Sequence, residues 1–470
     1  MRRRELYIHR NWKLRFIAHN ARFLPPPDSK TERAMTSTTD ASRKSATFLL
    51  TSTIAPGHFL RVLDLAQQLT SRGHRVLFKA KANMAAEVKA AGAEHLPYEH
   101  MIDLQDLGTL FPHTSAPAWM PTIPFGFAHV RRLILANNVQ LAMELEPVLR
   151  REQVDCVVYD FFEVGAAWAA ERAGIPFVSA GNMGTTLTRD ELPLMFSVLP
   201  KLRHVNRIPA LAHGLLGQLF SLREPREKLG LAPYKGRTAE MIQGMISPRL
   251  HIIMSHQGLA GDIPLRDRQL FVGPTTFNVP AKGQQPREAP RVAPGTVVIS
   301  TTTTPGDKGL FRRVLEAVAP MNVPVLATSA GAQDIPSGLG SHIRIERYVP
   351  HDDVFPQAQA LVTHGGWGTV GRALTYGLPM LVIPLFGDQP LNAQLVERAG
   401  LGRYLPLDKA TPETIRAELQ ALLADEGIRN RMKKISADIK QLKSEQVAAQ
   451  ALEKIAFEGK VDVKARASAA

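Results

Sequence analysis

The sequence has a single cysteine among its 470 residues, and this cysteine, Cys156, lies inside an apolar run that is typical of a buried strand. One cysteine excludes an internal disulfide and a zinc site built from cysteines, so we expect a protein of the reducing cytoplasm. Long apolar runs are also missing, since none approaches the roughly 18 residues that a membrane-spanning helix needs. Repeats at the period of a solenoid are absent as well. What remains is an ordinary globular composition, with 44% hydrophobic and 21% charged residues.

The net charge of +14 invites a nucleic-acid-binding interpretation, but the distribution of the charge argues against one. Residues 1–34 carry nine Lys and Arg against three Asp and Glu, and residues 428–470 carry ten against five. The two ends therefore hold +6 and +5, which leaves only +3 for the rest of the chain. Basic tails are more often solvated or weakly attracted to membranes, and no nucleic-acid motif accompanies these. We predict no nucleic-acid partner, no stable membrane insertion and at most weak contact with a membrane surface.

A chain of 470 residues exceeds the usual size of one hydrophobic core, so two domains are expected. Residues 1–34 lack the features of a secretory signal. A start codon assigned too early, with Met35 as the true start, is preferred over an Arg-rich presequence. The predicted parts are a basic extension that we expect to be disordered, a first α/β domain, a polar Pro-rich linker, a second α/β domain, and a helix with a tail, at residues 1–44, 45–279, 280–294, 295–445 and 446–470.

The first domain opens with alternating apolar runs and helical patterns. The apolar run 46–54 is followed by the turn Ala55-Pro56-Gly57-His58, by apolar residues at helical spacing between Leu60 and Leu69, and by a second apolar run at 74–80. This order of strand, loop, helix and strand starts a parallel sheet of the doubly wound type. Further elements are predicted as a helix at 129–150 and as strands at 154–160 and 177–180.

Two stretches of the first domain, 100–128 and 183–236, are rich in Pro, Phe, Leu and Met and show no clear periodicity. Such segments are typical of loops and helices laid over a site, so we expect them to build an apolar pocket. The second domain repeats the alternation of strands and helices. Its elements are predicted as strands at 296–300, 323–328 and 343–349, a helix at 306–319, and helices between 411 and 457.

The stretch Ala360–Ala393 is the most informative part of the chain. It is predicted to form a strand, a tight turn at His364-Gly365-Gly366, a helix, and a second strand that begins near Met380. Glycines at 366 and 368 let the backbone approach a ligand closely. The helix that opens near Thr369 would point unpaired N–H groups and a partial positive charge at that ligand, so phosphate is the expected guest.

Two interpretations of this stretch compete. Asp388 and Gln389 follow the second strand, at the carboxyl edge of the sheet, where open α/β folds bind ligands. With Asp388 near the expected offset of about 20 residues, Gly366-x-Gly368-x-x-Gly371 formally matches a dinucleotide-binding fingerprint and would indicate NAD. The whole stretch, however, resembles the donor-binding signature of the nucleotide-sugar-dependent glycosyltransferases of the macrolide, flavonoid and glucuronosyl type, at positions His364, Gly366, Thr369, Asp388, Gln389 and Asn392. A dehydrogenase has no reason to require this set.

The resemblance implies a role for each matching residue. The turn with His364, Gly366 and Thr369 would hold the diphosphate of the donor, while Asp388 and Gln389 would hold the hydroxyls of its sugar. The other donor-binding positions that it implies are Tyr348, Val349 and His351 at the nucleobase, Thr302 in the loop that closes over the phosphates, and Trp367 and Gly368 beside the turn. Packing remains an alternative for Trp367, a strand end followed by a turn remains one for 348–351, and the glycine that the family has near Thr302 is missing.

Arg372 departs from the family pattern. Many members that use uridine donors carry a Glu at this place, whose carboxylate accepts hydrogen bonds from the ribose hydroxyls. Arginine can only donate. A phosphate, a neighbouring acid and solvent remain open as its partners, and thymidine donors become as plausible as uridine donors.

His58 and Asp160 are the predicted catalytic residues. As a residue type, histidine titrates near neutral pH and suits the removal of a proton from a hydroxyl. The context Ala-Pro-Gly-His is similar to the glycine-histidine of the family, whose histidine is the general base. The resemblance pairs this base with an Asp at the end of a strand such as 154–160, for which capping of the next helix is the structural alternative. Asp103 and Asp106 are the substitutes for Asp160 in this role.

The resemblance spans most of residues 45–440 and implies an α/β fold of the GT-B type, in which two doubly wound, Rossmann-like domains face each other across a cleft. A last helix would cross back onto the first domain, and 435–455 is long enough for that. The implied function is inverting transfer of a sugar from a nucleoside-diphosphate sugar, a co-substrate, to a hydroxyl of a small, largely apolar acceptor. No cofactor is implied, and the absence of an Asp-x-Asp pair speaks against a metal. An NAD(P)-dependent oxidoreductase and a non-catalytic GT-B partner protein are the alternatives.

Overall fold

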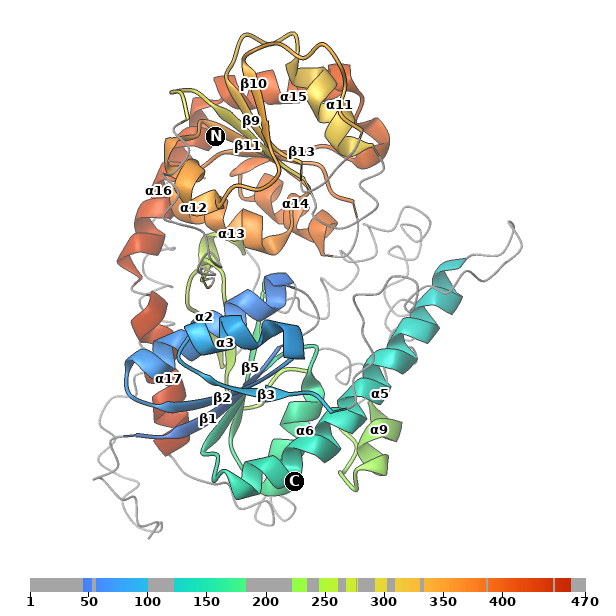
Figure 1. The fold of residues 1–470 in the computed structure, drawn as a ribbon, viewed down its shortest axis with the longest axis vertical. Coiled ribbons are helices and arrows are strands. Elements are labelled where there is room, and N and C mark those ends of the chain that lie inside the picture. Colours follow the sequence, from blue (N-terminus) through green and yellow to red (C-terminus); the bar gives the residue numbers. More distant parts are fainter. Residues whose placement is uncertain are drawn as a thin grey trace, which may run out of the picture.

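The chain folds into two α/β domains, each built on a parallel sheet, as the computed structural model shows (Figure 1). No helix among the residues described is both long enough and apolar enough to cross a membrane. The structure describes residues 45–52, 56–99, 122–182, 222–234, 245–260, 268–275, 277, 292–301, 309–329, 334–385, 388–442 and 444–457.

The sheet of the first domain has seven parallel strands in the order β3-β2-β1-β4-β5-β6-β7. Parallel sheets are covered on both faces, so their strands are apolar along most of their length. Accordingly, β1 (Thr47–Thr51) and β4 (Cys156–Asp160) are buried at every position, and they pair directly. The other strands are β2 (Arg75–Ala80), β3 (Glu94–Pro97), β5 (Phe177–Gly181), β6 (His251–Ile253) and β7 (Gln269–Phe271).

Helices cover both faces of this sheet because successive strand residues point to opposite sides. Phe48 and Leu50 of β1 share a core with α2 (Pro56–Ser71), whereas Leu49 shares the core on the other face with α5 (Thr122–Arg151) and α6 (Val164–Ala173). Two short helices complete the described part of the domain, α3 (Ala85–Ala90) and α9 (Arg223–Lys228).

The sheet of the second domain has six parallel strands in the order β10-β9-β8-β11-β12-β13. The strands are β8 (Val297–Ser300), β9 (Val325–Thr328), β10 (Ile343–Glu346), β11 (Ala360–Thr363), β12 (Met380–Val382) and β13 (Gly402–Tyr404). The helices packed around it are α11 (Leu310–Val318), α12 (His351–Val354), α13 (Trp367–Tyr376), α14 (Gln389–Arg398), α15 (Pro412–Ala424) and α16 (Glu426–Gln441). Its core also takes in Ile253 and Phe271 of the first sheet, so the two domains share apolar contacts.

The last helix returns to the first domain, which confirms the predicted crossing. α16 packs on α13 in the second domain, and α17 (Ser444–Phe457) then lies along α2 and β4 of the first domain (Figure 1). The apolar face of α17, including Ala448, Leu452 and Ile455, is buried in the same core as Leu63 of α2. The first domain is therefore completed by the end of the chain.

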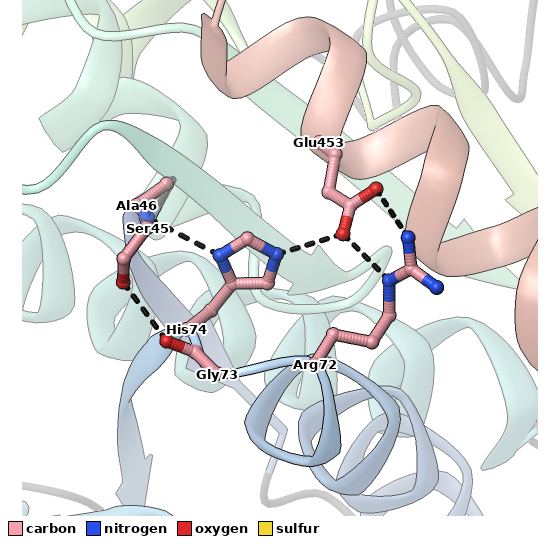
Figure 2. A network of polar contacts seen from close by, with 6 residues as sticks. All are labelled: Ser45, Ala46, Arg72, Gly73, His74 and Glu453. Carbon is pink, nitrogen blue, oxygen red and sulfur yellow. Dashed lines mark hydrogen bonds and ion pairs between the residues drawn. The ribbon is translucent and has the colours of Figure 1, made fainter. Parts of the chain in front are cut away.

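A polar network holds α17 in place (Figure 2). Glu453 of α17 accepts hydrogen bonds from Nε and Nη2 of Arg72 at 2.6 and 2.8 Å, and its Oε1 lies 2.8 Å from Nε2 of His74. Nδ1 of His74 accepts the backbone N–H of Ala46 at 3.2 Å. The imidazole therefore carries its proton on Nε2 and donates it to the carboxylate. The hydrogen bond from Arg72 is the main cause that lowers the pKa of Glu453, so this carboxylate is ionised at neutral pH.

Four short strands, β3, β6, β7 and β13, were not among the predicted elements. Their sequences, EHLP, HII, QLF and GRY, contain no apolar run of more than two residues, so they lack the pattern by which the other short strands were recognised. The long helix predicted at 129–150 begins earlier, at Thr122, and runs to Arg151 with Pro147 inside it.

Candidate active site

The predicted catalytic residues of the first domain lie where the strand order of its sheet reverses. The strands run outward in both directions from β1 and β4, and open α/β sheets bind ligands at the carboxyl ends of the strands at such a switch point. β1 leads into α2, whose third residue is His58, and β4 ends on Asp160. Because β1 and β4 are parallel neighbours, these two side chains come to the same edge of the sheet.

His58 and Asp160 form a hydrogen-bonded pair. Nδ1 of His58 lies 2.7 Å from Oδ2 of Asp160, and Oδ1 of Asp160 accepts the backbone N–H of Phe162 at 3.1 Å. The side chain of His58 is 16% exposed and that of Asp160 only 1%, so the imidazole is the member of the pair that meets solvent. The next helix, α6, begins after Glu163 and has no side-chain cap, so Asp160 does not serve as its cap.

The environment of Asp160 keeps its carboxylate ionised. Burial alone would raise the pKa of Asp160, but the charge and the hydrogen bond of His58, the charge of Arg61 and the Phe162 amide together lower it below its usual value. An ionised carboxylate only accepts hydrogen bonds, so Nδ1 of His58 carries the proton and Nε2 keeps a lone pair. An acid that fixes the tautomer of a histidine in this way prepares it to act as a base.

The loop beneath His58 is held by close contact between α5 and α6. Nδ2 of Asn138 on α5 donates to the carbonyl of Phe162 at 2.9 Å, and Oδ1 of Asn138 accepts the N–H of Gly165 at 2.6 Å. A Cβ at position 165 would lie 2.1 Å from the carbonyl oxygen of Asn138, so only glycine permits this approach. The rings of Phe161 and Phe162 pack near the imidazole, with centroids 5.9 and 5.4 Å from that of His58.

The predicted phosphate turn lies at the switch point of the second sheet, between β8 and β11. Gly365 has a φ of +86°, and a Cβ there would lie 2.6 Å from Cγ1 of Val382. Its N–H donates to Oγ1 of Thr363 at 3.2 Å. The residue that requires glycine for its backbone conformation is therefore Gly365, whereas Gly366 is extended and needs a small residue because a Cβ would lie 2.5 Å from Nε2 of His364.

The N-terminus of α13 faces the turn without a side-chain cap. The helix starts at Trp367, and its N-cap is Gly366, which has no side chain to cap it. A Cβ added at Gly368 would have no atom within 4 Å, so there is space for a ligand against the backbone of this residue. Burial lowers the pKa of the nearby His364, against a hydrogen bond that the imidazole donates to the backbone of Ser300 and against the charge of Asp388, which both raise it. Thr369 is 9% exposed in the same turn.

Asp388 joins the two domains at this edge. Its Oδ2 accepts from Nδ2 of Asn392 at 3.2 Å and from Nδ2 of Asn182 at 3.2 Å, and Asn182 directly follows β5 of the first domain. Asn392 also donates to the carbonyl of Gly365 at 2.9 Å, which ties Asp388 to the phosphate turn. The neighbouring Gln389 is 6% exposed, and its Oε1 accepts the N–H of Leu385 at 2.9 Å, so the amide also braces the preceding loop.

The segment predicted to hold the nucleobase follows β10. Tyr348 is exposed at 69%, which leaves its ring open to a stacking partner, while Val349 is buried in the domain core at 4%. The ring of His351 stacks on Phe355 at 4.5 Å, and its Nε2 lies 3.0 Å from Oγ of Ser300. Burial, followed by the charge of Arg372, lowers the pKa of His351 to about 4, so this histidine is neutral at physiological pH.

Comparisons with known proteins agree with this geometry. The family model described as "Erythromycin biosynthesis protein CIII-like, C-terminal domain" matches residues 312–455. The 4'-demethylrebeccamycin synthase of Lentzea aerocolonigenes is 27% identical over 80% of this chain and 92% of its own. The oleandomycin glycosyltransferase of Streptomyces antibioticus is 24% identical over 83% and 86%. The solved glycosyltransferase VinC, in complex with dTDP, superposes with a TM-score of 0.66 at 20% identity over 88% of this chain and all of its own.

The comparisons support a macrolide-type, family-1 glycosyltransferase, as the resemblance of the sequence predicted. The GT-B fold predicted for this glycosyltransferase is confirmed, as two parallel α/β domains that match solved members. The nicotinamide interpretation of the glycine fingerprint finds no support among the relatives.

Two residues of the signature in this glycosyltransferase have partners within the protein. Trp367 is 4% exposed and its indole N–H donates to the carbonyl of Met254 at 3.1 Å, a contact between the domains. Nε of Arg372 lies 3.2 Å from Oδ2 of Asp352. Of the three partners considered for Arg372, a phosphate, a neighbouring acid and solvent, the structure places the acid beside it. The donor-binding role of Trp367 stays a prediction.

The sequence did not point to every residue of the site. Asn182 and Arg61 were not predicted, although both carried a signal: Asn182 is the polar residue directly after a strand, and Arg61 interrupts an apolar helical pattern one turn after His58. Thr302, Asp103 and Asp106 lie outside the residues that the structure describes, so their predicted roles stay predictions.

Proposed function

We propose that this glycosyltransferase transfers a sugar from a nucleoside-diphosphate sugar to a hydroxyl of a small, largely apolar acceptor, with inversion at the anomeric carbon. The observation that carries the proposal is the His58–Asp160 pair at 2.7 Å, on the domain edge that contacts Asp388 through Asn182. A base oriented by an acid thus stands beside the residue assigned to the donor sugar. The relative named oleandomycin glycosyltransferase supports an acceptor of the natural-product class.

In the proposed reaction Nε2 of His58 removes the proton of the acceptor hydroxyl. The oxygen attacks the anomeric carbon, the bond to the phosphate oxygen breaks, and the nucleoside diphosphate leaves from the opposite face. Asp160 stabilises the imidazolium that forms. General-base assistance contributes roughly 10²–10⁴-fold, and the alignment of two bound substrates can contribute at least as much.

The donor diphosphate is assigned to the second domain. The uncapped N-terminus of α13, with His364 and Thr369, offers N–H groups, a hydroxyl and a partial positive charge. Because these groups favour negative charge without an ion, we propose that the enzyme needs neither a metal nor another cofactor. The uridine and thymidine forms are both proposed donors, and the relative VinC bound to dTDP supports the second. The reducing cytoplasm remains the proposed compartment, in keeping with the single, buried Cys156.

Ligand-dependent thermal stabilisation tests the donor class first. A ligand present at 100 times its dissociation constant adds about 2.7 kcal/mol to the free energy of unfolding, which a melting curve resolves. UDP or dTDP should stabilise the protein and NAD should not, with or without EDTA. Stabilisation by NAD alone would overturn the proposal, and dependence on a divalent cation would overturn its metal independence.

His58→Ala tests the chemistry. Transfer to an ordinary alcohol should fall by roughly 10²–10⁴-fold while nucleoside-diphosphate binding persists, because His58 serves the acceptor. A variant that turns over such an acceptor within a few-fold of the wild type would reject the general-base role. A protein that shows no transfer before the substitution, with any acceptor tried, would favour the non-catalytic alternative.

A further inference from the structure

Arg61 is a buried arginine whose hydrogen-bond donors are not used up within the protein. It lies on α2, one turn after His58, and is only 1% exposed. Its Nε and Nη1 have no hydrogen-bond partner among the residues that the structure describes. Charged groups are rarely buried so deeply unless they are paired, since desolvation of an unpaired ion is costly. A buried guanidinium with unpartnered N–H groups indicates a site for an anionic ligand.

Arg226 shows how the same chain treats a buried arginine that has only a structural role. It is 2% exposed, and its Nη1 and Nη2 bind both oxygens of Glu171 at 2.8 and 2.9 Å. Its Nε donates to the carbonyl of Ala232 at 2.7 Å. All three nitrogens of Arg226 are satisfied, so the lack of partners at Arg61 is specific to its position.

That position lies between the catalytic pair and the residue assigned to the donor sugar. Burial lowers the pKa of Arg61, while the charges of Asp160 and then Asp388 raise it, so both acids lie near its guanidinium. Neither acid accepts a hydrogen bond from Nε or Nη1 of Arg61. Asp160 is bonded to His58 and to the Phe162 amide, and Oδ2 of Asp388 is bonded to two asparagines. The two carboxylates offset the charge of Arg61 but leave the N–H groups of its Nε and Nη1 to a ligand.

The ligand that suits the N–H groups of a guanidinium is a planar oxyanion. Guanidinium binds a carboxylate through two parallel N–H···O bonds, and such charged pairs are stronger than neutral hydrogen bonds. The diphosphate of the donor is assigned to α13, on the other domain. An oxyanion that reaches Arg61, beside Asp388 and one turn from His58, therefore belongs to the sugar. An amino sugar would instead bring a second cation to the guanidinium.

We propose that Arg61 is a specificity-determining residue that binds the carboxylate of an acidic sugar in the donor, an inference that rests on the proposed function. The enzyme should therefore prefer a nucleotide-linked uronic acid over the corresponding neutral hexose. A neutral sugar still has its hydroxyls at Asp388, but it leaves the buried N–H groups of Arg61 unpaired. Sites built to bond a polar group discriminate strongly against analogues that lack it.

The test compares UDP-glucuronic acid with UDP-glucose in the full-length protein, by calorimetric affinity and by kcat/KM. The two donors share one nucleoside, so the ratio of their affinities reports on the sugar alone. For the wild type this ratio should favour UDP-glucuronic acid at least tenfold, and in Arg61→Met it should fall to about one. Arg61→Lys, which keeps the charge and loses the fork, should give a reduced ratio.

Three results would overturn the inference: a wild-type ratio below tenfold, a ratio that Arg61→Met leaves intact, or a loss of more than tenfold in the affinity of Arg61→Met for UDP itself. The last result would assign Arg61 to the phosphate. If Arg61→Met fails to fold in a thermal melt, Arg61→Lys decides, and an unchanged ratio in that variant rejects the inference. Failure of the proposed function is recognised separately, because the wild type would then bind none of the three ligands.

Discussion

Asp160→Asn isolates the contribution of the acid to the proposed base. The side chain keeps its size and still fills the 1% exposed space at the end of β4. It loses the negative charge beside His58. An asparagine that donates its own N–H to Nδ1 also moves the proton of the neutral imidazole to Nε2, which removes the lone pair that the reaction needs.

The size of the effect follows from the geometry of the pair. During the reaction His58 becomes an imidazolium whose Nδ1 lies 2.7 Å from the carboxylate oxygen. Charge centres about 4 Å apart attract each other by about 4 kcal/mol at an effective dielectric constant of about 20. Since about 1.4 kcal/mol corresponds to a factor of ten in rate, Asp160→Asn should lower kcat by about 10³-fold.

The assay is steady-state transfer to an alcohol acceptor, with nucleoside-diphosphate binding measured by calorimetry on the same protein. Binding should change less than about threefold, because the diphosphate is assigned to the second domain. Asp64→Asn is the matched control: it removes the same charge from α2, where Asp64 accepts from Gln68 at 2.7 Å, and it should retain activity. A phenolic acceptor that is already ionised should lose less than an alcohol. A kcat for the alcohol within fivefold of the wild type would refute the reasoning.

Three further predictions concern the donor and the pH dependence of stability. Asp388→Ala should lower the affinity for the intact sugar nucleotide by about tenfold or more, because charged hydrogen bonds to the sugar are lost, but the affinity for the bare nucleoside diphosphate by less than about threefold. Equal losses of the two affinities in calorimetry would assign Asp388 to the phosphates or the fold. UDP and dTDP should bind within about tenfold of each other, roughly 1.4 kcal/mol, because Arg372 lies against Asp352 and offers no acceptor to the ribose; a hundredfold uridine preference in titrations would contradict this. Burial lowers the pKa of His256 to about 4, and its Nδ1 accepts the N–H of Gly258. Between about pH 6.5 and 4 the unfolded chain therefore binds a proton at this histidine that the folded protein does not, so the stability of the fold decreases as the pH drops through that window. His256→Asn, which keeps an acceptor for Gly258, should reduce the loss of unfolding free energy between pH 7 and 5 by about 2 kcal/mol in chemical denaturation; an unchanged loss would show that other groups carry it.

The sequence predicted those residues of the site whose proposed role follows from the residue type and from its position in a strand–turn–helix unit. The order of strands and helices brings His58 and Asp160 to one edge, and the structure pairs them. Arg61 could not be assigned from sequence because its significance depends on its burial, on its lack of partners and on the nearby charge of Asp388 from the second domain, and no sequence pattern reports these.

The same limit applies to the glycines of the phosphate turn. Gly366 and Gly368 stand out in the motif, but Gly365 is the residue with a positive φ, and a Cβ there would also collide with Val382 from the next strand. Short edge strands such as β7 and β13 likewise depend on neighbours that are distant in the chain, and three residues carry too little pattern to reveal them.

The return of α17 to the first domain determines how this enzyme can be recombined with its relatives. A chimera that exchanges everything after the linker also exchanges α17, whose buried face and Glu453 must then fit a foreign α2, Arg72 and His74. A chimera that changes partner between α16 and α17 keeps that surface native and exchanges only the donor-binding unit. A domain exchange meant to change donor specificity therefore needs two junctions, one at the linker and a second near residue 443.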